Sequence, residues 1–400
     1  MKKNVQSILL FFALALLLMA GCKKDDEATK PEEVSSEVLQ QEEKEEQKSD
    51  ENDETKITIK DAIGREITLD KAAERAIADS PNTMRIYTYV MGAEKLIGIP
   101  PRDVASARRM PYAMGRRDEF MKLKHFGGSY NVDNLEEILM EKPDVFFSSH
   151  KEKADYEELS NKIKAPVIAL DQGPGVVFDP ILYDSIRIVG KVMNREDRAE
   201  EVVQYMEGLK KDLYDRTKDI PENEKSTVYA GGLAWNGPHG IEGTRENYPI
   251  FDVVHAKNVV TGLGKDGLVE IDKEKLLEWN PDFIFIDLAS IDIIQDDFNK
   301  NPDYYKSLKA FKEGKIFAQL PFVWCNVNVD TAMANAYYVG KIVYPEQFKD
   351  IDPVKKADEI YEFLVGRGVY DELAKEEFGG FQQISIEDFE ANKFFIDKTE

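Results

Sequence analysis

The sequence predicts an α/β protein built from two Rossmann-like lobes that a long, rigid α-helix bridges. A helix, a Pro-Asp turn and a buried strand occur twice, at residues 134–147 and again at 273–286. Between these copies, the roughly 40 residues 180–220 contain almost no helix breakers, which is typical of long helices. An apolar strand, an Asp-Ser-Pro-Asn turn and a helix follow one another at 76–83, as at the opening of a βα unit. A chain of 400 residues is long enough for two such lobes.

The first residues predict a targeting signal. Lys2 and Lys3 precede an unbroken apolar run of 12 residues at 8–19, and Ala-Gly stands directly before Cys22. The run is too short to cross about 30 Å of hydrocarbon as a helix, so a secretory signal is expected. The pattern resembles a bacterial lipoprotein signal, which implies that residues 1–22 are a signal peptide and that Cys22 is lipidated. An ordinary signal with an incidental cysteine is the alternative. Acyl chains on Cys22 would hold the protein at the outer face of the cytoplasmic membrane.

Residues 23–55 predict a disordered acidic tether. They contain 14 acidic residues, 5 lysines and almost nothing apolar. Such a segment cannot bury enough surface to offset the entropy lost on ordering, and its like charges extend it. A solvated helical arm is the alternative.

The first lobe is expected at 56–179. Two alternating strands around an Asp-Ala-Ile-Gly turn predict a hairpin at 57–69, before the βα unit that begins at 76. The first copy of the repeat then places a helix at 134–139, a Pro-Asp turn at 143–144 and a buried strand at 145–147. The matched spacing predicts that the second lobe, at 221–352, is built in the same way, although two copies can arise by chance.

The bridge is expected at 180–220. Ile181, Leu182, Ile186, Val189 and Met193 recur at helical spacing, and a second amphipathic helix is predicted at 196–217. After the second lobe, residues 353–400 are expected to form C-terminal helices and a tail.

Composition excludes several classes of function. The formal net charge of −23 disfavours nucleic acid as a partner, because a phosphate backbone would be repelled over most of the surface. The cysteines are Cys22 and Cys325, and only four histidines are present. These counts rule out a disulfide scaffold and disfavour a metal site that the protein alone supplies.

A ligand of a two-lobed α/β protein is expected in the cleft between the lobes, at the carboxyl ends of the strands. In the first lobe, the loops at those ends are predicted at 79–82, 100–128, 148–151 and 171–175. In the second lobe, they are predicted at 231–248, 287–291 and 320–326.

A basic island occupies the long first-lobe loop. Between 102 and 124, seven Arg and Lys residues face three acidic residues, a local charge of +4 in an acidic chain. Because arginine suits carboxylates, catecholates and phosphates, the island favours an anionic ligand. A solvated basic patch, or internal partners for acidic neighbours, is the alternative. Tyr112 and Tyr130 flank the island, where they could stack or ligate, although such aromatics are more often core residues.

The second-lobe loops contain Trp235 and Trp324 beside glycine, proline and cysteine, where a flat ligand could cover them. His150 and His239 lie on opposing lobes and could approach one iron, although a single histidine more often donates a hydrogen bond. Cys325 is expected to be a small buried filler. The candidate ligand-binding residues are Asn82, Arg108, Arg109, Tyr112, Arg116, Tyr130, His150, Trp235, His239, Arg245 and Trp324.

Several of these features together resemble one family. They are the lipoprotein signal, the acidic tether, the hairpin with Asp-Ala-Ile-Gly-Arg at 61–65 and the Asn-Leu-Glu that precedes Lys-Pro-Asp at 142–144. They are similar to substrate-binding lipoproteins of ABC importers for ferric siderophores, haem and cobalamin, whose lobes a rigid helix bridges. The similarity covers roughly residues 57–373 and includes the stretch 344–352. It implies that Glu136 and Glu274 dock into arginine pockets on the two permease subunits. Solvated glutamates on a helix face are the alternative.

The expected function is capture of a ferric siderophore or a related metal-organic anion, and its delivery to the ABC permease dimer in the membrane. No catalytic residue and no cofactor are expected, since a metal would enter only as part of the ligand, and a monomer is expected. A haem or cobalamin receptor of the same family, or a receptor for a molybdate-like oxyanion, is an alternative. A secreted lipoprotein enzyme is a different class, and the sequence contains no Gly-x-Ser-x-Gly, His-Glu-x-x-His or phosphate-loop motif in its favour.

Overall fold

The computed structural model describes residues 55–102, 107–127, 134–149, 152–174, 177–265 and 267–395. The expected signal peptide with Cys22, and all but the last residue of the expected tether, lie outside the described residues. Tyr130 and His150 also lie outside them.

The first lobe is built on a five-stranded parallel sheet with the order β5-β4-β3-β6-β7. Numbered in chain order, the strands lie 3-2-1-4-5, as in a doubly wound sheet. Successive strands are added on one side of β3 as far as β5 and then, from β6 on, on the other side, so the order of the strands reverses between β3 and β6. The central strands are short apolar runs that are buried throughout, as expected where helices cover both faces. The strands are β3 (Ala76–Ala78), β4 (Leu96–Ile99), β5 (Lys124–His125), β6 (Val145–Ser148) and β7 (Val167–Ala169).

An antiparallel hairpin of β1 (Ile57–Lys60) and β2 (Glu66–Leu69) precedes this sheet. The Asp61 carboxylate accepts hydrogen bonds from the Arg65 guanidinium at 2.7 Å and from the Ala169 amide at 3.2 Å, so the turn is tied to β7. The first-lobe helices are α2 (Pro81–Met91), α4 (Pro111–Gly115), α5 (Arg117–Phe120), α6 (Leu135–Glu141) and α7 (Lys153–Ile163).

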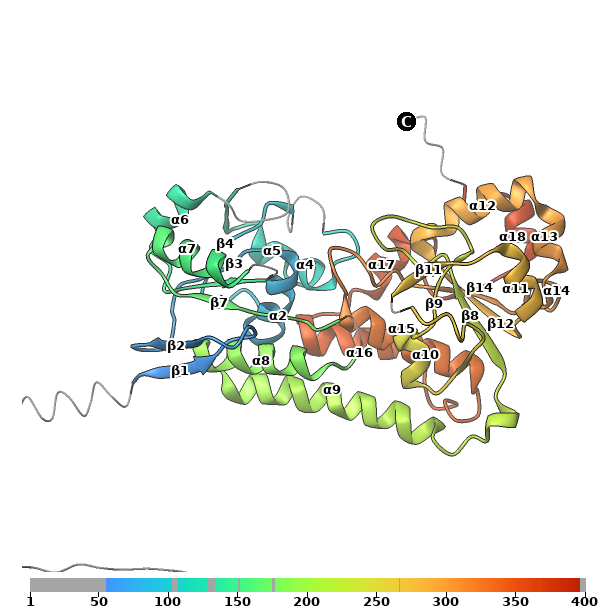
Figure 1. Cartoon of the computed structure of the whole chain (residues 1–400), viewed down its shortest axis with the longest axis horizontal. Helices are drawn as coiled ribbons and strands as arrows, with labels where there is room; N and C mark the ends of the chain where they lie inside the picture. The colour runs from blue at the N-terminus through green and yellow to red at the C-terminus, as the bar shows by residue number, and fades with distance from the viewer. Residues whose placement is uncertain are drawn as a thin grey trace, which may run out of the picture. The chain divides into compact units, whose positions relative to one another are not determined.

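Two helices follow the first lobe, α8 (Pro180–Met193) and α9 (Glu196–Thr217). At 22 residues, α9 is about 33 Å long. It contacts α8 and α2 on the first-lobe side and α10 and α15 on the second-lobe side, and Figure 1 shows it running beneath both lobes. The long helix therefore bridges the two sheets.

The second sheet has the order β10-β8-β12-β13-β14. The first four strands are parallel and β14 is antiparallel to β13. The order in which successive strands are added reverses between β8 and β12, which are parallel neighbours. The strands are β8 (Thr227–Gly231), β10 (Lys257–Asn258), β12 (Phe283–Asp287), β13 (Ile316–Gln319) and β14 (Gln382–Ile384), and a separate antiparallel pair comprises β9 (Gly243–Arg245) and β11 (Leu268–Glu270).

The C-terminal segment, for which the sequence predicted only helices and a tail, also supplies β14 to the second sheet. This strand has three residues and two glutamines, so it lacks a hydrophobic pattern that identifies a strand. The remaining elements are η1 (Glu222–Glu224), α10 (Pro249–Val253), α11 (Lys273–Trp279), η2 (Leu288–Ser290), α12 (Ile291–Lys300), α13 (Pro302–Ser307), α14 (Lys309–Lys312), α15 (Val329–Val343), α16 (Pro353–Val365), α17 (Tyr370–Glu376) and α18 (Ile386–Glu390).

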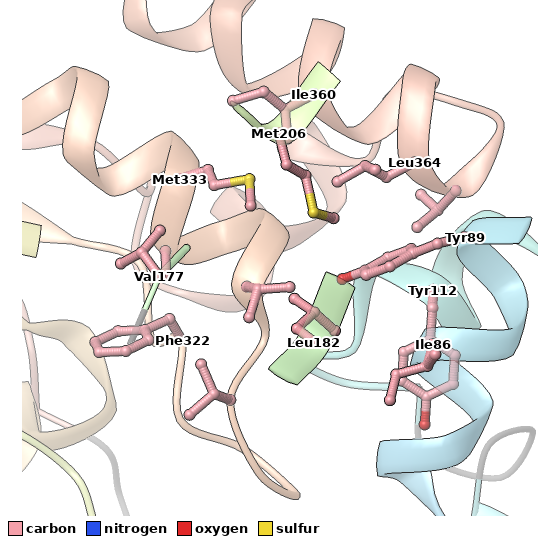
Figure 2. Close-up of a cluster of buried hydrophobic side chains, with 14 of the residues drawn as sticks. Ile86, Tyr89, Tyr112, Val177, Leu182, Met206, Phe322, Met333, Ile360 and Leu364 are labelled. Carbon is pink, nitrogen blue, oxygen red and sulfur yellow. The ribbon is translucent and has the colours of Figure 1, made fainter. Parts of the chain in front are cut away.

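One hydrophobic cluster extends across both lobes. Helix α16 packs against α15 of the second lobe and against α2 and α4 of the first. Figure 2 shows part of the cluster, with Tyr89 and Tyr112 from the first lobe, Met206 from α9, and Ile360 and Leu364 from α16. Because this contact is a buried apolar core rather than a polar interface, the lobes are joined stiffly.

Candidate ligand cleft and docking helices

A cavity of about 770 Å³ lies at the carboxyl ends of both sheets. Loops after β4 and β7 of the first lobe, and after β8, β12 and β13 of the second, form its wall. Each lining residue belongs to a loop in which the sequence predicted ligand contacts. The lining residues are Arg102, Arg109, Gly173, Pro174, Ala234, Trp235, Asn236, Gly237, Pro238, Ala289, Val323, Trp324, Cys325 and Asn326.

Two arginines from the first lobe stack on a tryptophan from the second. The Cζ atoms of Arg102 and Arg109 lie 5.4 Å and 5.1 Å from the centre of a Trp324 ring. At these distances a guanidinium is attracted to the face of an indole. Trp235 lies in the same wall and is 47% exposed, so the cavity offers a second aromatic surface.

Glu377, just after α17, holds Arg109 in place. Its carboxylate, which is fully buried, accepts bonds from Arg109 Nε at 2.5 Å and from Arg109 Nη2 at 2.7 Å. Arg108 contacts the same carboxylate at 3.3 Å. Arg108 and Arg109 therefore share one buried carboxylate at this corner of the cleft.

A second acid lies beneath the same wall. Asp287 ends β12, is fully buried, and accepts a hydrogen bond at 2.9 Å from the backbone amide of Ala289, a cavity-lining residue. Burial raises the pKa of Asp287 to about 7; Glu377 also raises it, whereas Arg109 and the backbone hydrogen bonds oppose the shift. The negative charge behind the cavity therefore increases as the pH rises through neutrality.

His239 braces the loop that carries Trp235. Its Nε2 lies 3.0 Å from the Trp235 carbonyl oxygen and its Nδ1 lies 2.8 Å from Glu270. Desolvation lowers the pKa of His239, but the bonds to Trp235 and Glu270 outweigh it and raise that pKa overall. Because both ring nitrogens are engaged, His239 positions the loop and offers no nitrogen to a metal.

A buried arginine of α2 joins the two lobes behind the cavity. Arg85 is fully buried and donates to Asn328 Oδ1 at 2.9 Å and to Gln172 Oε1 at 3.3 Å. Gln172 in turn donates to the Val327 carbonyl at 3.0 Å. Arg85 was not among the predicted site residues, although a charged residue among the buried positions of α2 was the available signal.

Of the candidate ligand-binding residues, Arg109, Trp235 and Trp324 line the cavity. The structure places the other described candidates away from the lining. Tyr112 is fully buried in the core shared by the lobes, so it does not reach the cleft. Asn82 is buried in the first turn of α2, and Arg245 lies on β9, where its charge acts on Asp252. Arg108 contacts Glu377 from outside the lining.

Arg116 has a structural position between two helix ends. A Cβ atom on Gly92 would lie 3.1 Å from its Cζ, and a Cβ on Gly366 would collide with its guanidinium. Gly92 and Gly366 cap the C-termini of α2 and α16 with φ values of 61° and 94°. The Arg116 charge therefore lies where the dipoles of both helices are negative, outside the lining of the cavity.

Much of the basic island is paired with acidic residues. Arg116 contacts Glu119 at 3.3 Å, Lys124 contacts Glu141, and Arg108 and Arg109 share Glu377. Of this island, the described cavity lining includes only Arg102 and Arg109.

Cys325 differs from its expected role as a buried filler. It is half-buried, lines the cavity and has a φ of 48°, in the left-handed region. A bend in the backbone there turns the residue toward the cleft, which composition alone does not reveal.

Two equivalent helices, α6 and α11, carry the predicted docking glutamates. Glu136 and Glu274 are each the second residue of their helix, and both are exposed. Each helix ends at a left-handed residue before Pro-Asp, Lys142 in one copy and Asn280 in the other.

The aspartates of the two Pro-Asp turns also have matching roles. Asp144 accepts a bond at 3.0 Å from the Arg75 amide, just before β3. Asp282 accepts a bond at 2.7 Å from the Thr227 amide, at the start of β8. The internal repeat is therefore a repeat in three dimensions, and it places Glu136 and Glu274 at equivalent points on the two lobes.

Neither of these two glutamates, for which docking is predicted, has a hydrogen bond or an ion pair with the residues that the structure describes. Neighbouring side chains on the same helices are paired: Glu137 accepts from Asn134 at 3.0 Å, and Lys275 contacts Glu278 at 2.9 Å. The carboxylates of Glu136 and Glu274 are thus available to a partner.

The periplasmic binding protein family model matches residues 113–319, more than half of the chain. The chain belongs to this family. Members of the family are extracytoplasmic binding components of ABC transporters rather than enzymes, and this periplasmic binding protein is the substrate-binding component of an ABC importer.

Two curated relatives match most of this periplasmic binding protein. The molybdate-binding protein MolA of Haemophilus influenzae is 22% identical over 324 residues, which cover 76% of this chain and 89% of MolA. An uncharacterised ABC transporter substrate-binding lipoprotein of Bacillus subtilis, YvrC, is 22% identical over 299 residues, which cover 74% of this chain and 87% of YvrC.

Solved structures agree on the fold. The TroA-like periplasmic binding protein FepB from Veillonella parvula matches with a TM-score of 0.60 at 22% identity, covering 78% of this chain and 97% of FepB. MolA of Haemophilus influenzae with bound molybdate matches with a TM-score of 0.58 at 20% identity, covering 78% of this chain and 98% of MolA. These matches confirm the predicted class of two α/β lobes on a helical backbone. Within the described residues, no helix combines the length and hydrophobicity needed to cross a membrane.

Proposed function

We propose that this binding protein captures a ferric siderophore or a related metal-organic anion outside the cytoplasmic membrane and delivers it to its permease. The observation that carries the proposal is the cavity between the lobes, where Arg102 and Arg109 lie over Trp324 and Trp235 is exposed. This combination suits a ligand with negative charge and flat aromatic arms, such as a ferric catecholate.

The size of the cavity supports a chelate rather than a bare ion. Its volume of about 770 Å³ lies within the roughly 300–1,000 Å³ range of sites for organic ligands. A tetrahedral oxyanion would fill only a small part of it and would leave the aromatic surfaces uncovered.

The donor groups support a ligand that brings its own metal ligands. No group of three or more His, Cys, Asp and Glu that could hold a metal occurs in the described parts of the chain. His239 is committed to Trp235 and Glu270, so it is no axial ligand for haem. Haem remains an alternative through Tyr130 or His150, which lie outside the described residues. Cobalamin is an alternative ligand for an aromatic cleft, but it makes less use of the positive charge of the arginines.

A molybdate-like oxyanion is the second candidate. The relative MolA binds molybdate by its name, and its structure with molybdate shares the fold of this chain. Arg102 and Arg109 would supply the positive charge that an oxyanion requires.

The proposal includes the rest of the delivery route. Lipidated Cys22 anchors the protein to the outer face of the membrane, which the lipoprotein description of YvrC supports. A monomer docks on the permease dimer through Glu136 and Glu274, whose exposed carboxylates, unpaired among the described residues, support this role. The ligand is carried without covalent chemistry.

A fluorescence titration tests the ligand class. Trp235 and Trp324 line the cavity, whereas the remaining tryptophan, Trp279, lies on α11. We expect a saturable change with a ferric tris-catecholate siderophore, retained in Trp279→Phe and diminished in Trp324→Phe. Haemin, cyanocobalamin and sodium molybdate are titrated in parallel. Saturation with molybdate alone would replace the chelate by the second candidate. No saturation with any probe, or chemical turnover of one, would overturn the proposal.

A further inference from the structure

An exposed leucine stands one helical turn after each docking glutamate. Leu139 follows Glu136 by three residues and is 40% exposed, and Leu277 follows Glu274 by three residues and is 37% exposed. Side chains three residues apart lie on the same face of a helix. Each lobe therefore presents a carboxylate and an isobutyl group side by side.

Other side chains anchor these two helices to their lobes. The residue before each leucine, Ile138 in α6 and Leu276 in α11, is fully buried and anchors the helix to its own core. Leu139 and Leu277 occupy the next position, which turns toward solvent.

The two helices agree in burial at every position, yet they differ in most exposed side chains. The segments 134–143 and 272–281 have the same order of buried, half-buried and exposed residues. At the exposed positions, Asn134 corresponds to Asp272, Met140 to Glu278 and Lys142 to Asn280, whereas glutamate and leucine are identical in both copies. The repeat therefore retains a glutamate and a leucine on its exposed face where the neighbouring side chains differ.

We propose that Leu139 and Leu277 form, with Glu136 and Glu274, a two-point docking surface in which each point combines an acid and an apolar group. A surface presented twice fits a partner that offers the same site twice, a cationic group beside an apolar depression. The two subunits of the permease are that partner, so the inference rests on the proposed function and adds the apolar half of each contact.

The two groups have complementary physical roles. The carboxylate gives direction through charge-assisted hydrogen bonds to a guanidinium. The leucine gives affinity through apolar burial, and it excludes water from the neighbouring ion pair, which strengthens that pair. An acid on each lobe without its leucine would be a screened, solvent-exposed contact.

The test measures binding of the full-length protein to its permease dimer in lipid nanodiscs by biolayer interferometry. The double variant Leu139→Ala and Leu277→Ala is compared with Leu139→Met and Leu277→Met, which restores apolar area. Val354→Ala is the control, because Val354 is an apolar helix residue of similar exposure, 36%, on a helix outside the repeat, α16. Alanine preserves helix propensity, and thermal melting verifies that each variant folds.

We expect the double alanine variant to bind the permease about tenfold more weakly or worse, while the methionine pair and Val354→Ala bind as the wild type does. The fluorescence response of the double alanine variant to the ferric tris-catecholate or molybdate probe stays unchanged. Wild-type affinity in the double alanine variant, with binding lost in the Glu136→Ala and Glu274→Ala pair, would overturn the leucine contact alone. No binding by the wild type would overturn the proposed function, and the inference with it.

Discussion

Arg109 and Glu377, 268 residues apart in the chain, form a buried bidentate ion pair in the wall of the cavity. Arg109 comes from the first lobe, and Glu377 from the C-terminal segment that also completes the second sheet. The end of the chain therefore reaches back to hold a cleft residue, and the cleft depends on elements from both ends of the fold.

Replacing Glu377 tests this ion pair. Glu377→Gln leaves the Arg109 guanidinium buried without its counter-charge, which we expect to cost on the order of 3 kcal/mol of unfolding free energy. Urea denaturation at pH 7 measures it. The control is Glu372→Gln, whose pair with Arg367 is 48% and 42% exposed, and we expect that change to cost less than about 1 kcal/mol. Equal stability of the two variants would contradict the role of the buried pair.

The stability of the protein should depend on pH through Asp287. Burial raises its pKa from 3.8 to about 7, so the folded protein retains a proton that the unfolded chain has lost between these values. The corresponding stability is present in full below about pH 4 and is lost as the pH rises through 7.

Between pH 5 and 8, we expect the unfolding free energy of the wild type to fall by roughly 2 kcal/mol relative to that of Asp287→Asn. Urea denaturation of both proteins across this range measures the difference. Parallel curves would show that Asp287 does not titrate in the folded state as its burial requires.

Arg116 should matter for stability and not for ligand binding. Arg116→Ala removes a charge from the C-termini of α2 and α16, which we expect to cost about 1–2 kcal/mol. Thermal melting measures this loss, with the exposed neighbour Arg117→Ala as control. A change in ligand affinity without a loss of stability would show that Arg116 acts on the ligand and not on the helix ends.

The docking glutamates should matter for transport and not for capture. In the Glu136→Ala and Glu274→Ala double variant, we expect uptake by cells to be abolished while affinity for the ligand stays intact. The reason is that both carboxylates lie on the repeated helices α6 and α11, outside the cavity lining. The control replaces Glu158 and Glu313, exposed acids in the first-lobe helix α7 and just after the second-lobe helix α14. Uptake by the double variant at the wild-type rate would contradict the docking role of Glu136 and Glu274.

Much of the fold could be predicted because its signals are local. The strand at 76–78 and the helix at 196–217 have the predicted bounds, since an apolar run and a breaker-free amphipathic segment define them. The repeat could be recognised because its helix, Pro-Asp turn and strand follow at fixed spacing. Strand β14 could not be predicted, because it forms by pairing with the distant strand β13 and its own three residues carry no hydrophobic pattern.

The site was predictable at the level of loops and less so at the level of side chains. The carboxyl ends of parallel strands determine which loops meet, and tryptophans beside glycine and proline mark exposed aromatic surface. Which arginines reach the cleft depends on acids elsewhere in the chain, such as Glu377 for Arg109. For Arg116 it depends on two glycines, Gly92 and Gly366, that only the folded chain brings together.

The central claim is that the cavity between the lobes binds an anionic metal chelate on Trp324 and its arginines. Isothermal titration of the wild type, Trp324→Ala and Arg102→Gln with a ferric tris-catecholate siderophore tests it most directly. We predict one saturable site in the wild type and a loss of about tenfold or more in affinity in each variant, which is about 1.4 kcal/mol or more. Equal affinities in all three proteins would contradict the claim.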